Sequence, residues 1–105
     1  MKSISVSDRI EFAAQSGAFE VSLYVWGNTA KKLVKDGLVL TETKIQSPRR
    51  GEKYYLISWA DAKIAVPDGP FDYENIILEN RKQGIYLNNA QILWLMATAK
   101  NRSNY

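Results

Sequence analysis

Alternating apolar and polar side chains are clearest in the middle of the chain, where they predict two strands. Residues 38–45 (LVLTETKI) and 53–59 (KYYLISW) are rich in β-branched and aromatic side chains, which favour strands. The segment between them, QSPRRGE, contains the proline and glycine that are typical of a hairpin loop. The pattern therefore predicts a β-hairpin.

Apolar residues at helical spacing predict three helices around this hairpin. The first covers residues 28–36, and Gly37 would end it as a C-terminal cap. Two more are expected after the VPDGP turn, from residue 73 to about 83 and from residue 88 or 89 to about 101. The predicted fold class is therefore α+β.

The stretch before residue 28 fits two different structures. As two helices around a tight turn, it would place Ala13 at a close helix crossing and Gly17 in the turn. Leu23 and Trp26 would then lie three residues apart on the inner face of the second helix. Alternatively, residues 19–26 alternate apolar and polar side chains with the period of a half-buried strand. This second interpretation predicts a small antiparallel sheet that includes residues 19–26 and packs on helices.

The helical interpretation carries a family resemblance. An alanine at position 13, a glycine four residues later, and apolar residues at 23 and 26 resemble the DNA-binding helix-turn-helix of phage repressors and MerR-type regulators. The resemblance covers about twenty residues. Followed by a hairpin, it implies a winged helix-turn-helix domain of MerR-like or excisionase-like type. The loop with Arg49 and Arg50 would then be the wing, which lies along the DNA backbone.

The C-terminal half shows a second resemblance. The segment GIYLNNAQILWL, preceded by Arg81 and Lys82, is similar to the last strand and helix of positive-cofactor-four-type single-stranded-DNA-binding proteins. It implies a dimer whose curved sheets hold single strands through basic and aromatic contacts. The candidates for stacking on bases are Tyr54, Tyr55, Trp59 and Tyr86.

Composition narrows the classes of function. The 105 residues are enough for one domain, with an expected DNA-binding half at residues 1–66 and a C-terminal helical half at 71–101. Cysteine and histidine are both absent, which removes the commonest general base and the usual zinc ligands. The acidic residues show no paired spacing, and no glycine-rich phosphate loop is present. We therefore expect no enzymatic activity, no metal and no cofactor. No apolar run is long enough to span a membrane, and a cytoplasmic location is expected.

Positive charge is concentrated in one segment. The net charge is +3, yet residues 31–53 hold seven basic residues against three acids. Such a cluster indicates a phosphate-binding face, although a solvated helix followed by a polar loop produces the same pattern. The predicted function is sequence-specific DNA binding, as a transcriptional regulator or recombination accessory protein, with duplex favoured over single strand. The predicted DNA-binding residues are Ser22, Tyr24, Asn28, Lys31, Lys32, Lys35, Arg49, Arg50 and Lys53.

The last predicted helix has an apolar arc wider than a surface helix needs. This width predicts either burial in the domain's own core or a partner surface, such as a homodimer contact between C-terminal helices. The residues of that surface would be Ile92, Trp94, Leu95 and Met96. Two alternative functions follow from these patterns: a single-stranded-DNA-binding protein, or a protein-interaction or inhibitor module that binds no nucleic acid.

Overall fold

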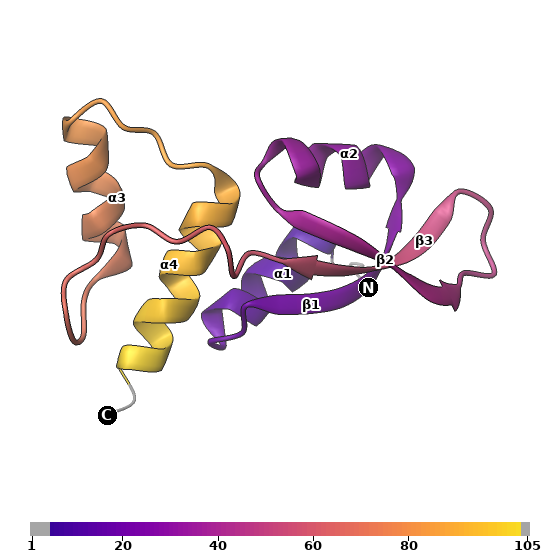
Figure 1. Ribbon diagram of the computed structural model, residues 1–105, viewed down its shortest axis with the longest axis horizontal. Helices are drawn as coiled ribbons and strands as arrows, with labels where there is room; N and C mark the ends of the chain where they lie inside the picture. The colour runs from indigo at the N-terminus through magenta and orange to yellow at the C-terminus, as the bar shows by residue number, and fades with distance from the viewer. Residues whose placement is uncertain (1–4, 104–105) are drawn as a thin grey trace.

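The computed structural model describes residues 5–103, which form an α+β fold (Figure 1). Within this range, helices and strands follow one another in the order α1, β1, α2, β2, β3, α3, α4. Their bounds are Val6–Gln15 for α1, Glu20–Trp26 for β1, Gly27–Lys35 for α2, Val39–Gln46 for β2, Glu52–Ser58 for β3, Tyr73–Lys82 for α3 and Asn89–Arg102 for α4.

Helix α1 is the first of the two helices that the helical interpretation predicted, and it begins at Val6. The side chain of Ser5 caps the helix by accepting a hydrogen bond of 3.1 Å from the backbone N–H of Asp8. Ile10 and Ala14 are buried and hold the helix on the core. The helix ends before Gly17, whose positive φ of 93° suits glycine.

Residues 20–26 form a strand, so the prediction of a second helix with Leu23 and Trp26 facing inward was wrong. The alternative prediction, a sheet that includes this stretch, is confirmed. The physical reason is twofold. The period-two alternation places apolar side chains on one face only, and antiparallel pairing with β3 satisfies the backbone along the whole of β1. No helix-turn-helix is therefore present at residues 9–26.

The sheet has the order β1-β3-β2, and both pairings are antiparallel. The predicted hairpin of residues 38–45 and 53–59 is confirmed, because β2 and β3 lie within one residue of these bounds. A register shift between Glu42 and Gln46 interrupts the β2–β3 ladder close to the loop. The central strand is thus β3, and β1 is an edge strand.

The register divides the sheet into two faces. One face carries Val25 and Ile57, which are fully buried and share a core with residues of α1 and α2. The other, which we call the open face, lies on the opposite side from these helices. By alternation it carries Glu20, Ser22, Tyr24 and Trp26 of β1, Glu52, Tyr54, Leu56 and Ser58 of β3, and Val39 and Thr41 of β2. Tyr24, Trp26 and Val39 remain 43–49% exposed there.

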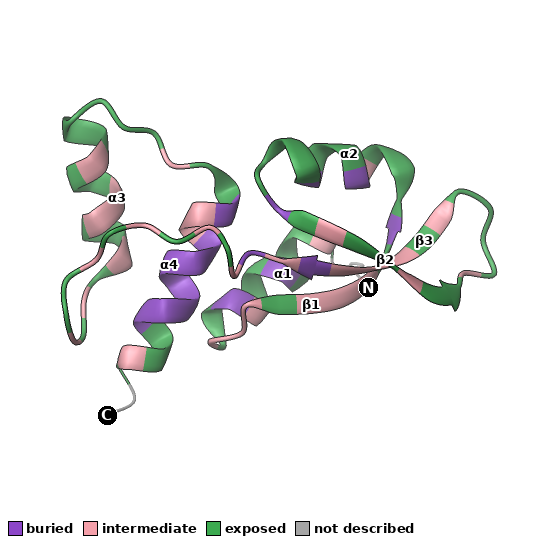
Figure 2. Cartoon of the chain, in the orientation of Figure 1, coloured by how far each residue is buried: buried purple, intermediate pink, exposed green. Residues whose placement is uncertain are grey.

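The middle of helix α4 is buried on all sides, as Figure 2 shows, whereas the ends of the helix are partly exposed. Residues 93–99 are consecutively buried, with α1 and α3 both packed against the helix. A run of seven covers every side of a helix, which explains the wide apolar arc. Trp94, Leu95 and Met96 lie in the core and Ile92 packs against it, so these residues form no exposed partner surface. The prediction of a dimer contact through these side chains was therefore wrong.

The C-terminal helices begin as their caps indicate. The side chain of Asp72 accepts from the backbone N–H of Glu74, and Asn88 and Gln91 form a reciprocal capping box at α4. Residues 85–88, between α3 and α4, belong to no strand. The last strand implied by the positive-cofactor-four resemblance is therefore missing.

Candidate nucleic-acid interface

Helix α2 presents its predicted DNA-binding residues to solvent. Ala30 and Leu33 are buried, which turns the opposite side of the helix outward. Asn28, Lys31, Lys32 and Lys35 are all exposed. Within residues 5–103 the lysines form no ion pair, so their charges are free to attract an anionic partner.

The loop between β2 and β3 is held in place by Ser47. Its hydroxyl donates a hydrogen bond of 2.6 Å to the Glu52 carboxylate and accepts one of 3.1 Å from the backbone N–H of Arg49. Glu52 in turn donates its backbone N–H to the Arg49 carbonyl at 3.3 Å. These contacts fix the position of the Arg49 backbone. Lys53, by contrast, lies 3.3 Å from Glu42 in an exposed ion pair on the hairpin.

Aromatic rings gather on the open face where β1 meets β3. Tyr24 and Tyr54 are paired across the two strands, with ring centroids 4.6 Å apart and planes inclined at 58°. Trp26 pairs with Glu52 one step further along the same face. A Cβ atom at Gly51 would lie 3.6 Å from the Trp26 ring, so the indole lies beside the loop.

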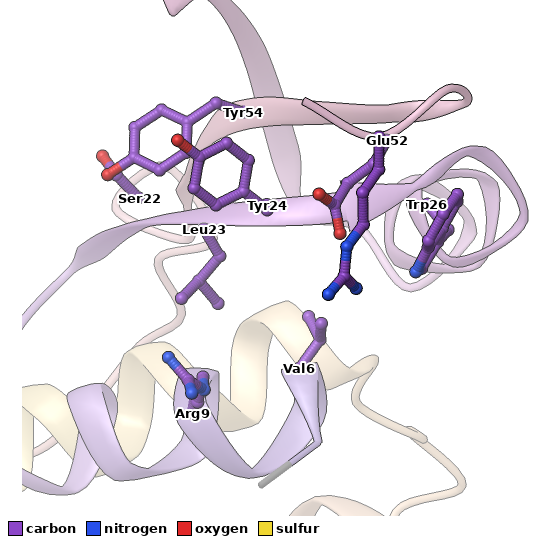
Figure 3. A pocket seen from close by; sticks show the side chains of 9 residues that line it. Val6, Arg9, Ser22, Leu23, Tyr24, Trp26, Glu52 and Tyr54 are labelled. Atoms are coloured by element: carbon purple, nitrogen blue, oxygen red, sulfur yellow. The ribbon is translucent and has the colours of Figure 1, made fainter. Parts of the chain in front are cut away.

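A cavity of about 590 Å³ joins these rings to α1, and we call it the β1-edge cavity. Figure 3 shows Tyr24, Tyr54 and Glu52 on one side of β1, and Val6 and Arg9 of α1 on the other side. The cavity therefore follows the free edge of β1 from the open face to the helix below. Its lining residues are Val6, Arg9, Ser22, Leu23, Tyr24, Trp26, Arg49, Glu52 and Tyr54.

Two arginines and one glutamate are the charged side chains along the β1-edge cavity. Arg9, Arg49 and Glu52 are its charged residues, and none of them has an ion-pair partner within the part of the chain that the structure describes. Among the described lining residues the surplus is one positive charge, and three aromatic rings lie beside it. Guanidinium groups bind phosphates through paired N–H donors, and exposed rings stack on bases. The arrangement therefore offers groups that suit phosphates and flat aromatic ligands.

The structure brings together only some of the predicted site residues. Ser22, Tyr24 and Arg49 line the β1-edge cavity, as does the stacking candidate Tyr54. The cavity contains none of the remaining predicted DNA-binding residues, which are Asn28, Lys31, Lys32, Lys35, Arg50 and Lys53.

For two of the other candidates, the prediction that they stack on bases was wrong. Trp59 is 1% exposed and donates its indole N–H to the Ala18 carbonyl at 3.0 Å, and Tyr55 packs against the core. Tyr86 is exposed but lies outside the β1-edge cavity.

Sequence reasoning missed Arg9, Trp26 and Glu52 as members of this site. Trp26 was assigned to a helix core, and only the strand alternation of residues 19–26 could have moved it to the same face as Tyr24. Arg9 had no local signal, because its proximity to Arg49 depends on how α1 packs beneath β1.

Within 5–103, no group of three or more acidic, histidine or cysteine side chains is arranged to hold a metal ion. None of the helices in that range combines the length and the apolar character needed to cross a bilayer. Comparison with protein-family models, with curated proteins and with solved structures found no match for this chain.

Proposed function

We propose that this protein binds single-stranded nucleic acid along the open face of its sheet, at the β1-edge cavity. The observation that carries the proposal is the placement of Tyr24, Trp26 and Tyr54 beside two arginines that have no ion-pair partner among the described residues. Stacking on aromatic rings and phosphate binding by arginine are the two contacts that single-strand-binding proteins combine.

The single strand is favoured over the duplex for a geometric reason. The rings on the open face can stack only on bases whose flat faces are accessible, which a paired duplex does not offer along its length. The helix-turn-helix that predicted duplex binding is replaced by β1. The two arginines of this site lie on α1 and on the loop between β2 and β3, and both line the cavity along the edge of β1, where a flexible backbone can reach them.

A second candidate function is duplex DNA binding through α2. It is favoured by Asn28, Lys31, Lys32 and Lys35, which recur at helical spacing and are all exposed. Lysines so placed contact phosphates, and asparagine can read an adenine edge. This candidate keeps the role of a regulator or recombination accessory protein, with α2 in the groove.

The intrinsic fluorescence of Trp26 provides a direct readout of binding. This side chain is 46% exposed, whereas Trp59 and Trp94 are 1% and 8% exposed, so intrinsic fluorescence changes on binding report mainly on Trp26. We would titrate the protein at two salt concentrations with oligothymidine and oligouridine of about 12 nucleotides, a length within the range of single-strand site sizes. A duplex of equal length serves as the comparison.

The expected result is quenching of Trp26 by the single strands, with binding weakened in Tyr24→Ala. The matched control is Tyr86→Ala, because Tyr86 is 77% exposed and lies outside the cavity. A comparison of the thymidine and uridine oligomers separates DNA from RNA. The absence of binding at low salt would overturn the proposal. Tighter binding of the duplex, lost when Lys31 and Lys35 are changed to Ala, would favour α2 instead.

A further inference from the structure

Among the described residues that line the β1-edge cavity, Glu52 has the single acidic side chain. Its Oε1 accepts from the Ser47 hydroxyl at 2.6 Å, while Oε2 makes no hydrogen bond to any described residue. Glu52 is partly buried and pairs in register with Trp26 on the open face. Side chains paired in this way have Cβ atoms about 5 Å apart, so a base stacked on the indole would have an edge next to the carboxylate.

A carboxylate can only accept hydrogen bonds, and this property selects among the bases. The pairing edge of guanine presents two neighbouring donors, N1–H and the N2 amino group. Adenine and cytosine each present one amino group next to an acceptor nitrogen, and thymine and uracil present one N–H between two carbonyls. Guanine is thus the base that a carboxylate complements best. A phosphate at the same position would be repelled by the like charge of Glu52.

We propose that the β1-edge cavity is a guanine subsite, in which Glu52 accepts from the pairing edge of guanine and Trp26 stacks on its ring. Arg9 and Arg49 hold the phosphates on either side. The cavity's volume of about 590 Å³ is within the range of small-molecule sites. This inference rests on the proposed function and specifies its base preference.

The test uses oligothymidine of about 12 nucleotides and the same oligomer with one central guanine, which cannot form guanine quadruplexes. We expect the guanine-containing strand to bind about tenfold more tightly, as a bidentate base contact would give. Replacing guanine by hypoxanthine, the base of inosine, which lacks the N2 amino group, should remove most of this preference. Replacing it by 7-deazaguanine should keep the preference, because the pairing edge is unchanged.

The protein variant is Glu52→Gln, which removes the charge but keeps an oxygen that can accept from Ser47. It should lose the preference for guanine, so that it binds the two strands with equal affinity. The control is Glu20→Gln, which removes the same charge from the same strand pair outside the cavity and should keep the preference. A far-UV circular dichroism spectrum and a denaturation midpoint like those of the wild-type protein show that Glu52→Gln is folded.

The outcomes separate the two proposals. Equal binding of both strands, with Tyr24→Ala still weakening each, overturns the guanine subsite and leaves single-strand binding intact. Loss of the preference with 7-deazaguanine also overturns it, because an arginine would then be reading the O6 and N7 edge. If neither strand binds, the proposed function itself fails.

Discussion

The side-chain amide of Asn101, near the end of α4, donates a hydrogen bond of 3.0 Å to the backbone carbonyl of Gly17, in the turn after α1. The two residues are 84 positions apart in the chain. At the other end of α4, the side chain of Asn88 lies against Gly37, which follows α2. Both glycines have positive φ angles. Helix α4 thus contacts, at its two ends, the turns that terminate the two N-terminal helices.

This contact makes Gly17 less replaceable than an ordinary turn glycine. Its φ is 93°, and a Cβ atom there would lie 2.8 Å from Oδ1 of Asn101. Gly17→Ala should therefore lower the free energy of unfolding by the left-handed backbone cost of about 1–2 kcal/mol, and further because the Asn101 side chain must move away and lose its hydrogen bond to Gly17. Urea denaturation monitored by circular dichroism measures this loss.

The matched control for Gly17 is Gly84→Ala. Gly84 has a φ of 81°, and a Cβ atom there would have no neighbour within 4 Å among the described residues, so its substitution incurs the backbone cost alone. Gly17→Ala should be the more damaging of the two. The excess should shrink when Asn101 is also changed to Ala. Equal losses for both glycines would contradict a role for the Asn101 contact.

The side chain of Thr98 places an unsatisfied hydroxyl group in the core. Its hydroxyl is buried and has no hydrogen-bond partner among the described residues, which is unfavourable in an apolar environment. Thr98→Val keeps the shape and removes the polar group, so we expect the free energy of unfolding to rise by about 1 kcal/mol. Thr98→Ser keeps the hydroxyl and loses a methyl group, and it should be destabilising. Both changes are read as shifts in the denaturation midpoint.

Ionisation of Tyr73 makes the free energy of unfolding depend on pH in the alkaline range. Burial raises the pKa of its phenol above the ordinary value, and the negative charges of Glu74 and Glu11 raise that pKa further. The folded state therefore holds the Tyr73 proton more tightly than the unfolded state. The resulting stability is fully present below the unfolded pKa of about 10 and is lost as the pH rises through the folded value.

The test compares the wild-type protein with Tyr73→Phe. The free energy of unfolding should fall less steeply above pH about 10 in the variant, because it has no proton to lose at that position. Parallel curves for the two proteins would show that ionisation of Tyr73 is not coupled to unfolding.

Arg9 and Arg49 should account for part of the salt dependence of single-strand binding. Each phosphate contact contributes about 0.7 to the slope of log affinity against log salt for a single strand. Arg9→Ala and Arg49→Ala should therefore each reduce this slope by about 0.7. Arg81→Ala is the control, because Arg81 is exposed on α3 and does not line the β1-edge cavity. Three equal slopes would exclude these arginines from the interface.

Local signals located most of the elements. The hairpin needed only the β-branched and aromatic residues around a proline–glycine loop, and apolar residues at helical spacing predicted starts close to those of α3 and α4. Where a helix begins or a hairpin turns depends on backbone groups a few residues apart, so neighbouring side chains suffice to predict it. The exposed lysines of α2 also followed directly from its amphipathic pattern.

The sequence by itself determined where most helices begin and where the hairpin turns. It also determined the α+β class and which arginines and aromatic rings are present. Only the tertiary structure decided that residues 20–26 form a strand, because that choice depends on pairing with β3, more than 25 residues away. The same pairing placed Trp26 beside Glu52, and the packing of α1 placed Arg9 near Arg49. Such neighbours are set by long-range burial and strand register, which no local pattern specifies.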